Sequence, residues 1–300
     1  VSRPSTDQRT PVEGGTYTAL DLDQAGTGLG GITQADLNDI WDSAIEDTDN
    51  STLARKIIDD LGMKPKDRKF WNNSLKLPNR VRYWYEVSAE GFKSFLRVSD
   101  DNIKRFIALV SASSPRADPI DSLRRGMGSF SQYLAGTPID IDLTIPESVR
   151  EAIEYGTLSG LKTGSFAGTM QYILGLEKSA PLSTNDRQVA SSFGVTGDAI
   201  VQNPILYETL SRFYIKLRDR LNEQLPEGAE PFETWQLQAL GWVEERADTG
   251  QRTREQTDDY LAALHSTEGG KYKGIIPRLK DAGVIKTLWR LDHHFLKRNY

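Results

Sequence analysis

Apolar residues recur at intervals of three and four along most of this 300-residue chain, a spacing that places them on one face of an α-helix. In the segment 102–113 this face consists of Ile103, Phe106, Ile107 and Val110. Pro115 ends that segment, because proline cannot continue a helix. The same pattern predicts helices over 119–134, 146–155, 165–174, 186–193, 204–224, 232–246, 253–264 and 274–298. Since strand patterns are short and scattered, the sequence predicts an all-α protein.

The amino-terminal region has a different pattern. Residues 1–31 are rich in Pro, Gly and Asp and have no period, so we expect a flexible acidic arm. Thr33, with Asp36 in the capping-box position, begins a helix, and a second helix is expected over 53–61. Pro78 argues against a long helix in the segment that follows. The chain therefore divides into the arm (1–31), a helical extension with a connector (32–80) and the main helical domain (81–300).

Charge is distributed unevenly along the chain. The net charge is -5, but residues 1–62 hold twelve acidic and four basic side chains, so the rest is slightly basic, with 33 basic and 30 acidic side chains. A basic cluster interleaved with aromatic residues follows the acidic region. It consists of Lys64, Lys66, Arg68, Lys69, Lys76, Arg80 and Arg82 around Phe70, Trp71, Tyr83, Trp84 and Tyr85. Such a cluster is typical of a surface that binds phosphates and stacks bases. It is equally typical of a solvated basic surface over core aromatics.

Composition excludes several kinds of chemistry. The chain has no Cys and only three His, which excludes disulfides, thiolate nucleophiles and iron–sulfur clusters and argues against a metal site built from histidines. We therefore expect neither a metal nor a cofactor. No stretch approaches the ~20 apolar residues of a membrane helix, and we expect a cytoplasmic protein.

Two short segments carry most of the information on function. Residues 158–167 read LSGLKTGSFA, and residues 183–189 read STNDRQV. Together they predict a helix, a tight Gly-containing hairpin, a second helix, a loop and then a carboxylate, Asp186, in the first turn of another helix. A hairpin between helices offers backbone N–H groups to a phosphate, and an acid further along the chain can act on what that phosphate positions.

This order of parts resembles the helix-hairpin-helix DNA glycosylases over roughly residues 82–250. The segments 108–116 (ALVSASSPR) and 235–242 (WQLQALGW) are similar to a phage branch of that superfamily. That branch is associated with thymine hypermodification, in which an amine or amino acid displaces pyrophosphate from an activated 5-hydroxymethyluracil in DNA. The resemblance implies a glycosylase-like helical fold for the main domain. The hairpin here is about two residues shorter than the usual one.

The resemblance also implies roles for two residues. Lys162 lies where family members with lyase activity keep a Schiff-base lysine, although a contact with the DNA backbone or with water also suits it. Asp186 matches the carboxylate that stabilises positive charge on the sugar or activates an attacking group. A capping box between Ser183 and Asp186 would explain the acid without catalysis, and the two roles can coexist.

Further residues follow from the same comparison. DNA contacts are expected from Gly160, Thr163, Gly164, Ser165, Arg80, Arg82 and Arg187. A pocket for the base is expected from Ser113, Ser114, Arg116, Gln236 and Gln238. Small hydroxyl residues also suit an ordinary helix end, and a Trp-rich helix also suits a protein core.

The expected function is that of an enzyme acting on a base extruded from double-stranded DNA. The leading hypothesis is transfer of a small amine or amino acid to the base, and the alternative is excision of a modified base by a glycosylase. Two further hypotheses are a DNA-binding module without catalysis and an unrelated helical scaffold. Further expected partners are other DNA-modification enzymes, and the expected location is the cytoplasm of an infected host cell if a phage encodes the chain.

Overall fold

The computed structural model describes residues 66, 68–115, 117, 119–139, 146–195 and 199–251, and its regular elements are α-helices. These are α4 (Arg68–Ser74), α5 (Asn79–Arg82), α6 (Trp84–Leu96), α7 (Asp100–Ala112), α8 (Pro119–Ala135), α9 (Pro146–Tyr155), α10 (Leu161–Ile173), α11 (Arg187–Ser192), α12 (Ala199–Gln202), α13 (Pro204–Gln224) and α14 (Thr234–Asp248). The all-α prediction is confirmed for this part of the chain. The acidic arm and the helices predicted before residue 62 and after residue 252 lie outside the described residues.

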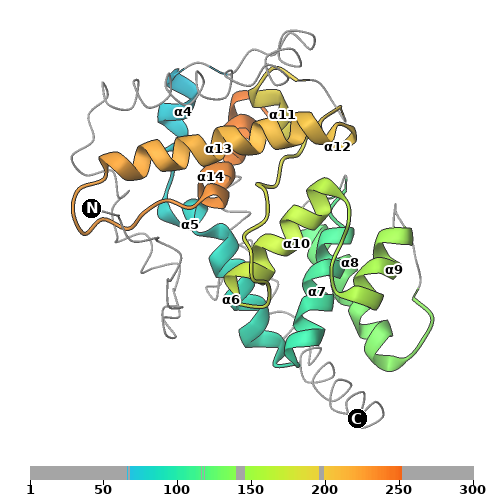
Figure 1. The fold of residues 1–300 in the computed structure, drawn as a ribbon. Coiled ribbons are helices and arrows are strands. Elements are labelled where there is room, and N and C mark those ends of the chain that lie inside the picture. Colours follow the sequence, from blue (N-terminus) through green and yellow to red (C-terminus); the bar gives the residue numbers. More distant parts are fainter. Residues whose placement is uncertain are drawn as a thin grey trace.

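The helices form two groups that meet along α6 (Figure 1). In the first group α7 packs against α8, α9 and α10, and in the second α14 packs against α4, α5, α11 and α13. Helix α6 contacts α7 and α10 on one side and α14 on the other. Side chains that point inward from both groups therefore meet beside α6.

Helix boundaries follow the capping signals of the sequence. Ser99 caps α7 by accepting a hydrogen bond from Asn102 N. Asn203 caps α13, with Pro204 in its first turn, where a missing N–H costs nothing. Helix α10 begins at Leu161, four residues before the predicted start. Gly160, with an extended backbone, is its N-cap residue. Pro78 separates α4 from α5, as expected.

The aromatic residues of the basic cluster belong to the core. Each of them is at most 9% exposed: Phe70, Trp71, Tyr83, Trp84 and Tyr85. The Trp71 ring packs against Phe193, Phe213 and Tyr214, with ring centres 5.3 to 6.2 Å apart. Of the two interpretations of this cluster, the structure therefore supports the core one, and these rings as a set are not a surface for stacking bases.

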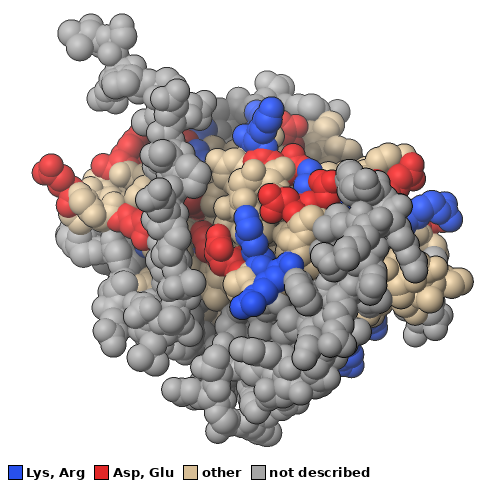
Figure 2. Space-filling model, turned by 90° about the horizontal axis from the view of Figure 1, so that it is seen from below, with Lys and Arg blue, Asp and Glu red and all other residues tan. Residues whose placement is uncertain are grey.

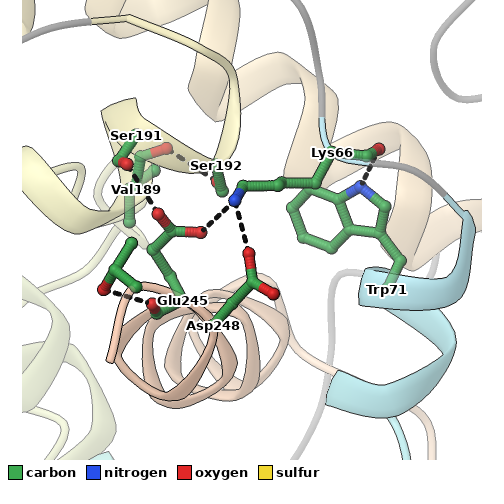
Figure 3. A network of polar contacts seen from close by, with 8 residues as sticks. Lys66, Trp71, Val189, Ser191, Ser192, Glu245 and Asp248 are labelled. Carbon is green, nitrogen blue, oxygen red and sulfur yellow. Dashed lines mark hydrogen bonds and ion pairs between the residues drawn. The ribbon is translucent and has the colours of Figure 1, made fainter. Parts of the chain in front are cut away.

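A polar network ties Lys66 to the second group of helices (Figure 3). The Lys66 ammonium pairs with Asp248 at 2.5 Å and lies 3.7 Å from a carboxylate oxygen of Glu245. The other oxygen of Glu245 accepts a 2.6 Å hydrogen bond from Ser191 Oγ. The hydrogen bond with Asp248 raises the pKa of Lys66, and burial raises the pKa of Glu245. The network thus joins the start of the described chain to α11 and α14.

The close contact between α7 and α8 at Gly126 predicts the outcome of a matched pair of glycine substitutions. A Cβ at Gly126 of α8 would lie 2.8 Å from the backbone of Val110 in α7, whereas a Cβ at Gly128 would meet nothing within 4 Å. Gly126→Ala should lower the free energy of unfolding by about 2 kcal/mol, because it forces α7 and α8 apart. Gly128→Ala should raise it by about 0.5 to 1 kcal/mol through helix propensity. Urea denaturation measures both, and equal effects at the two sites would contradict the packing described here.

Candidate functional site

A pocket lies where the two groups of helices meet beside α6. Its walls come from α6, α7, α8, α10, α14 and the segment before α11. The lining residues include the aromatic side chains Trp84, Tyr85, Phe92, Phe166 and Trp242. Flat aromatic walls of this kind suit a planar ligand.

Four residues singled out from the sequence line this pocket together. They are Ser114 at the end of α7, Lys162 in the first turn of α10, Asp186 before α11 and Gln238 in α14. These four residues are far apart in the sequence, so it is the fold that brings them to one pocket. The fold thus places both residues with predicted catalytic roles at the wall of one cavity.

Asp186 is the N-cap residue of α11, not a residue of its first turn. Its Oδ1 accepts hydrogen bonds from Gln188 N at 2.9 Å and from Val189 N at 3.1 Å. Its Oδ2 accepts a 3.0 Å hydrogen bond from Trp242 Nε1. The predicted capping box between Ser183 and Asp186 is therefore wrong: with Ser183 as the N-cap the helix would begin at residue 184, and it begins at Arg187. Three donors fix the carboxylate in one orientation.

The segment before Asp186 is held by a buried polar network centred on Asn185. Asn185 is 0% exposed, and its Nδ2 donates to Tyr207 O and to Ser211 Oγ on α13. Its backbone N–H donates to Tyr207 Oη, which in turn donates to Ser183 O. Ser183 Oγ donates to Asn185 Oδ1. A buried network whose donors and acceptors all form hydrogen bonds is rigid. The backbone that carries Asp186 is therefore held in one position.

Burial also keeps the phenols around Asp186 protonated. Burial raises the pKa of Tyr207 to about 12, and the charge of Asp186 acts in the same direction. Burial likewise raises the pKa values of Tyr85 and Tyr214, with a smaller contribution from Asp186. These hydroxyls are therefore neutral hydrogen-bonding groups at physiological pH.

Lys162 follows a tight hairpin between α9 and α10. Gly164 N donates to Gly160 O at 2.6 Å, and a Cβ at Gly164 would lie 2.5 Å from Leu158 O. Only glycine therefore fits at position 164. None of the ion pairs between described residues involves the Lys162 ammonium. A lysine at a pocket wall that no described carboxylate pairs with is available to a bound anion.

Two buried polar atoms of pocket residues have no hydrogen-bond partner among the described residues. They are Trp84 Nε1 and Ser114 Oγ. An unsatisfied buried donor or acceptor costs roughly 1 to 3 kcal/mol. Neither atom has surface open to the cavity, so both lie behind the pocket wall.

The hairpin itself is less suited to a phosphate than the sequence indicated. Thr163 and Ser165 are buried, and Ser111 Oγ donates to Thr163 O inside the protein. Gly160 is exposed, but Ser159 Oγ beside it donates to the carboxylate of Glu151.

On the face drawn in Figure 2, the described Lys and Arg side chains lie among Asp and Glu side chains instead of forming a separate basic patch.

Several other predicted contacts have a structural role. Arg82 is 3% exposed, and its guanidinium donates to Gln236 Oε1, Glu230 O and Pro231 O and lies 3.8 Å from the Phe232 ring centre. The prediction that Arg82 binds DNA is therefore corrected: this side chain is part of the interior. Gln236 is likewise engaged with Arg82 and Glu86 and does not line the pocket.

Of the remaining predicted site residues, one has a structural role, one is exposed and two have side chains outside the described residues. Ser113 is the C-cap residue of α7, and its hydroxyl donates to Leu109 O, so it forms an ordinary helix end. Arg187 is exposed and adjoins Asp186. The side chain of Arg80 and the whole of Arg116 lie outside the described residues.

Sequence reasoning missed most of the pocket walls. Trp84 and Tyr85 appeared only as members of the basic cluster, and Trp242 only as part of a Trp-rich helix. Phe166 occupies a regular position in α10, where its ring stacks on Trp84 with centres 5.9 Å apart. No local signal separates such a wall residue from a core residue, because the cavity forms only when distant helices pack.

Comparisons with known proteins found no match. No family model matches the chain, no curated protein is significantly similar to it, and no solved structure matches it significantly. Within the described ranges, no helix has the length and apolar character needed to cross a membrane. The same residues contain no group of three His, Cys, Asp or Glu side chains arranged to hold a metal ion.

The buried carboxyl of Glu86, which joins α6 to α14, predicts a pH-dependent effect. Glu86 Oε1 accepts from Trp235 Nε1 and Gln236 Nε2, Oε2 is buried without a partner, and burial raises the pKa to about 7 from 4.5. The folded protein therefore binds this proton more tightly than the unfolded chain, and stability falls as pH rises between about 4.5 and 7. Glu86→Gln should be more stable than the parent by about 2 kcal/mol above pH 7 and not below pH 4.5.

Thermal unfolding at a series of pH values measures this difference. Glu90→Gln, an exposed position on the same helix, is the matched control and should show no comparable gain. A Glu86→Gln advantage that is the same at pH 4.5 and pH 8 would show that the buried charge is not its cause.

Proposed function

We propose that the chain is an enzyme that modifies a base extruded from double-stranded DNA, by transfer of a small amine or amino acid to the base. The observation that carries the proposal is the meeting of Lys162 and Asp186 at one aromatic-walled pocket. An enzyme that reacts with a base in a duplex must remove it from the stack, and a pocket with flat walls replaces the lost stacking. Within this proposal, the main helical domain has a helix-hairpin-helix glycosylase-like arrangement, in which α9, the loop and α10 form the hairpin.

The proposed chemistry is a displacement at the 5-methylene carbon of an activated 5-hydroxymethyluracil. The amine nitrogen forms a bond to this carbon, the bond from the carbon to the pyrophosphate oxygen breaks, and pyrophosphate leaves with the electron pair. The new nitrogen carries an extra proton, which Asp186 accepts through a carboxylate oxygen as a general base. The Lys162 ammonium lies at the same cavity and stabilises the charge on the leaving pyrophosphate.

The same pair of residues also suits a glycosylase, which is the second candidate. In that reaction the bond between sugar and base breaks, Asp186 stabilises the positively charged sugar, and the carboxylate orients the attacking water. The fixed orientation of the Asp186 carboxylate serves both reactions. The products differ, since transfer alters the base on intact DNA and excision releases it.

Nucleoside mass spectrometry of DNA treated with the protein tests the proposal. The substrates are duplexes containing thymine, 5-hydroxymethyluracil or its pyrophosphorylated form, each incubated with a pool of amines and amino acids. We expect a new adduct on the intact nucleoside from the pyrophosphorylated substrate. Asp186→Asn should slow its formation by at least about 100-fold. The variant keeps the cap of α11, because Asn caps a helix as well as Asp, and loses the hydrogen bond from Trp242 Nε1, so its folding is checked by circular dichroism.

The matched control is Asp101→Asn, which changes an exposed acid in the first turn of α7 and should leave the rate unchanged. Released base with abasic sites would replace group transfer by the glycosylase reaction. Neither product, under conditions where the protein binds the duplex, would contradict an enzymatic function.

A further inference from the structure

Gln238 presents one end of its amide to the pocket. This residue of α14 lines the cavity, and its Oε1 accepts a 3.0 Å hydrogen bond from Tyr85 Oη. Within the described part of the chain no acceptor takes the Nε2 hydrogens, and Nε2 is not one of the fully buried polar atoms without a partner. The amide therefore offers the cavity its donor end.

A hydrogen bond from Tyr85 holds this orientation. Tyr85 is 3% exposed, and burial raises the pKa of its hydroxyl, which therefore keeps its proton. In the structure the hydroxyl donates this proton to Oε1. Rotated by half a turn, the Gln238 amide would instead donate from Nε2 to the Tyr85 oxygen and turn Oε1 toward the ligand. The direction of this hydrogen bond thus sets which end of the amide a ligand meets.

Lys162 adds a second donor to the pocket. Its ammonium donates hydrogen bonds and accepts none. The strongest acceptor, the Asp186 carboxylate, already receives three hydrogen bonds from the protein. A ligand that satisfies these groups must present acceptors, and the stacked pair Trp84–Phe166 at the wall favours a flat ring.

We infer that Gln238, oriented by Tyr85, makes the pocket select a base whose edge presents a carbonyl oxygen and reject one that presents an amino group at the same position. This inference rests on the proposed function, since it assumes that the ligand is an extruded base. A carbonyl oxygen accepts a hydrogen bond from Gln238 Nε2, whereas an exocyclic amino group brings two donors together and leaves both unsatisfied. Gln238 is then a residue that determines specificity, and Tyr85 is its positioning residue.

Uracil and cytosine provide the matched pair of probes. They share the pyrimidine ring and the carbonyl at position 2. At position 4 uracil has a carbonyl oxygen where cytosine has an amino group, and N3 correspondingly carries a hydrogen in uracil and a lone pair in cytosine. Each is placed opposite an abasic position in an otherwise identical duplex, so that extrusion breaks no base pair in either case. Fluorescence anisotropy of the labelled duplexes gives the ratio of the two dissociation constants. We expect the protein to bind the uracil duplex about 10-fold more tightly.

Three variants test the assignment of this preference. Gln238→Glu replaces the donor end by an acceptor and should reverse the preference in favour of cytosine. Tyr85→Phe removes the hydroxyl that orients the amide, so the ratio should fall toward one while the uracil duplex still binds. Gln224→Glu adds the same charge at an exposed position at the end of α13 and should keep the ratio of the unaltered protein.

The outcomes separate this inference from the proposed function. Equal binding of both duplexes, or the same ratio in the protein and in Gln238→Glu, overturns the role of Gln238 and leaves an enzyme acting on extruded bases in place. An absence of salt-dependent binding to any duplex overturns both, because the pocket then receives no base. A uracil preference that Gln238→Glu reverses and Gln224→Glu does not supports the inference.

Discussion

The buried Asn185 network is the constraint on which the candidate site depends. A loop between two helices has no hydrogen-bond ladder of its own, and the segment 183–186 instead uses the amide of Asn185 and the hydroxyls of Ser183 and Tyr207 to bind α13. The cost of burying an amide is offset only when its donors and acceptor are satisfied, as they are here. Asp186 can therefore act as a helix cap and face a cavity at the same time, because the residue before it cannot move.

A second consequence is that the site belongs to the contact between helix groups and not to any one motif. Trp242 reaches from α14 to the Asp186 carboxylate, while Trp84 of α6 stacks on Phe166 of α10. The pocket exists because α6 packs on both groups. Any shift of α14 relative to α6 changes the orientation of Asp186, of Gln238 and of the aromatic wall together. The Glu86 carboxyl, bonded to Trp235 and Gln236, lies in that same contact.

The sequence predicted most helices but only part of the site, for physical reasons. Proline and capping residues act locally, so the bounds of α9 and α13 agree with their signals. Lys162 and Asp186 line one cavity, and their roles stay predictions. Arg82 was misassigned because an arginine among aromatic residues looks the same in a sequence whether its guanidinium meets phosphates or backbone carbonyls. Burial distinguishes a phosphate-binding arginine from an interior one. The burial of Arg82 depends on residues 230–232, almost 150 positions away in the sequence.

The central claim is that an extruded base enters the pocket, and fluorine NMR of a duplex with one 5-fluorouracil opposite an abasic position tests it most directly. The account predicts a new fluorine resonance when the protein binds. It predicts that Ala117→Trp, which fills the pocket from its wall, abolishes this resonance without abolishing binding to the duplex. Ala135→Trp, the same change at an exposed position at the end of α8, should leave the resonance unchanged. A bound duplex whose fluorine resonance does not move, or moves equally with Ala117→Trp, would contradict it.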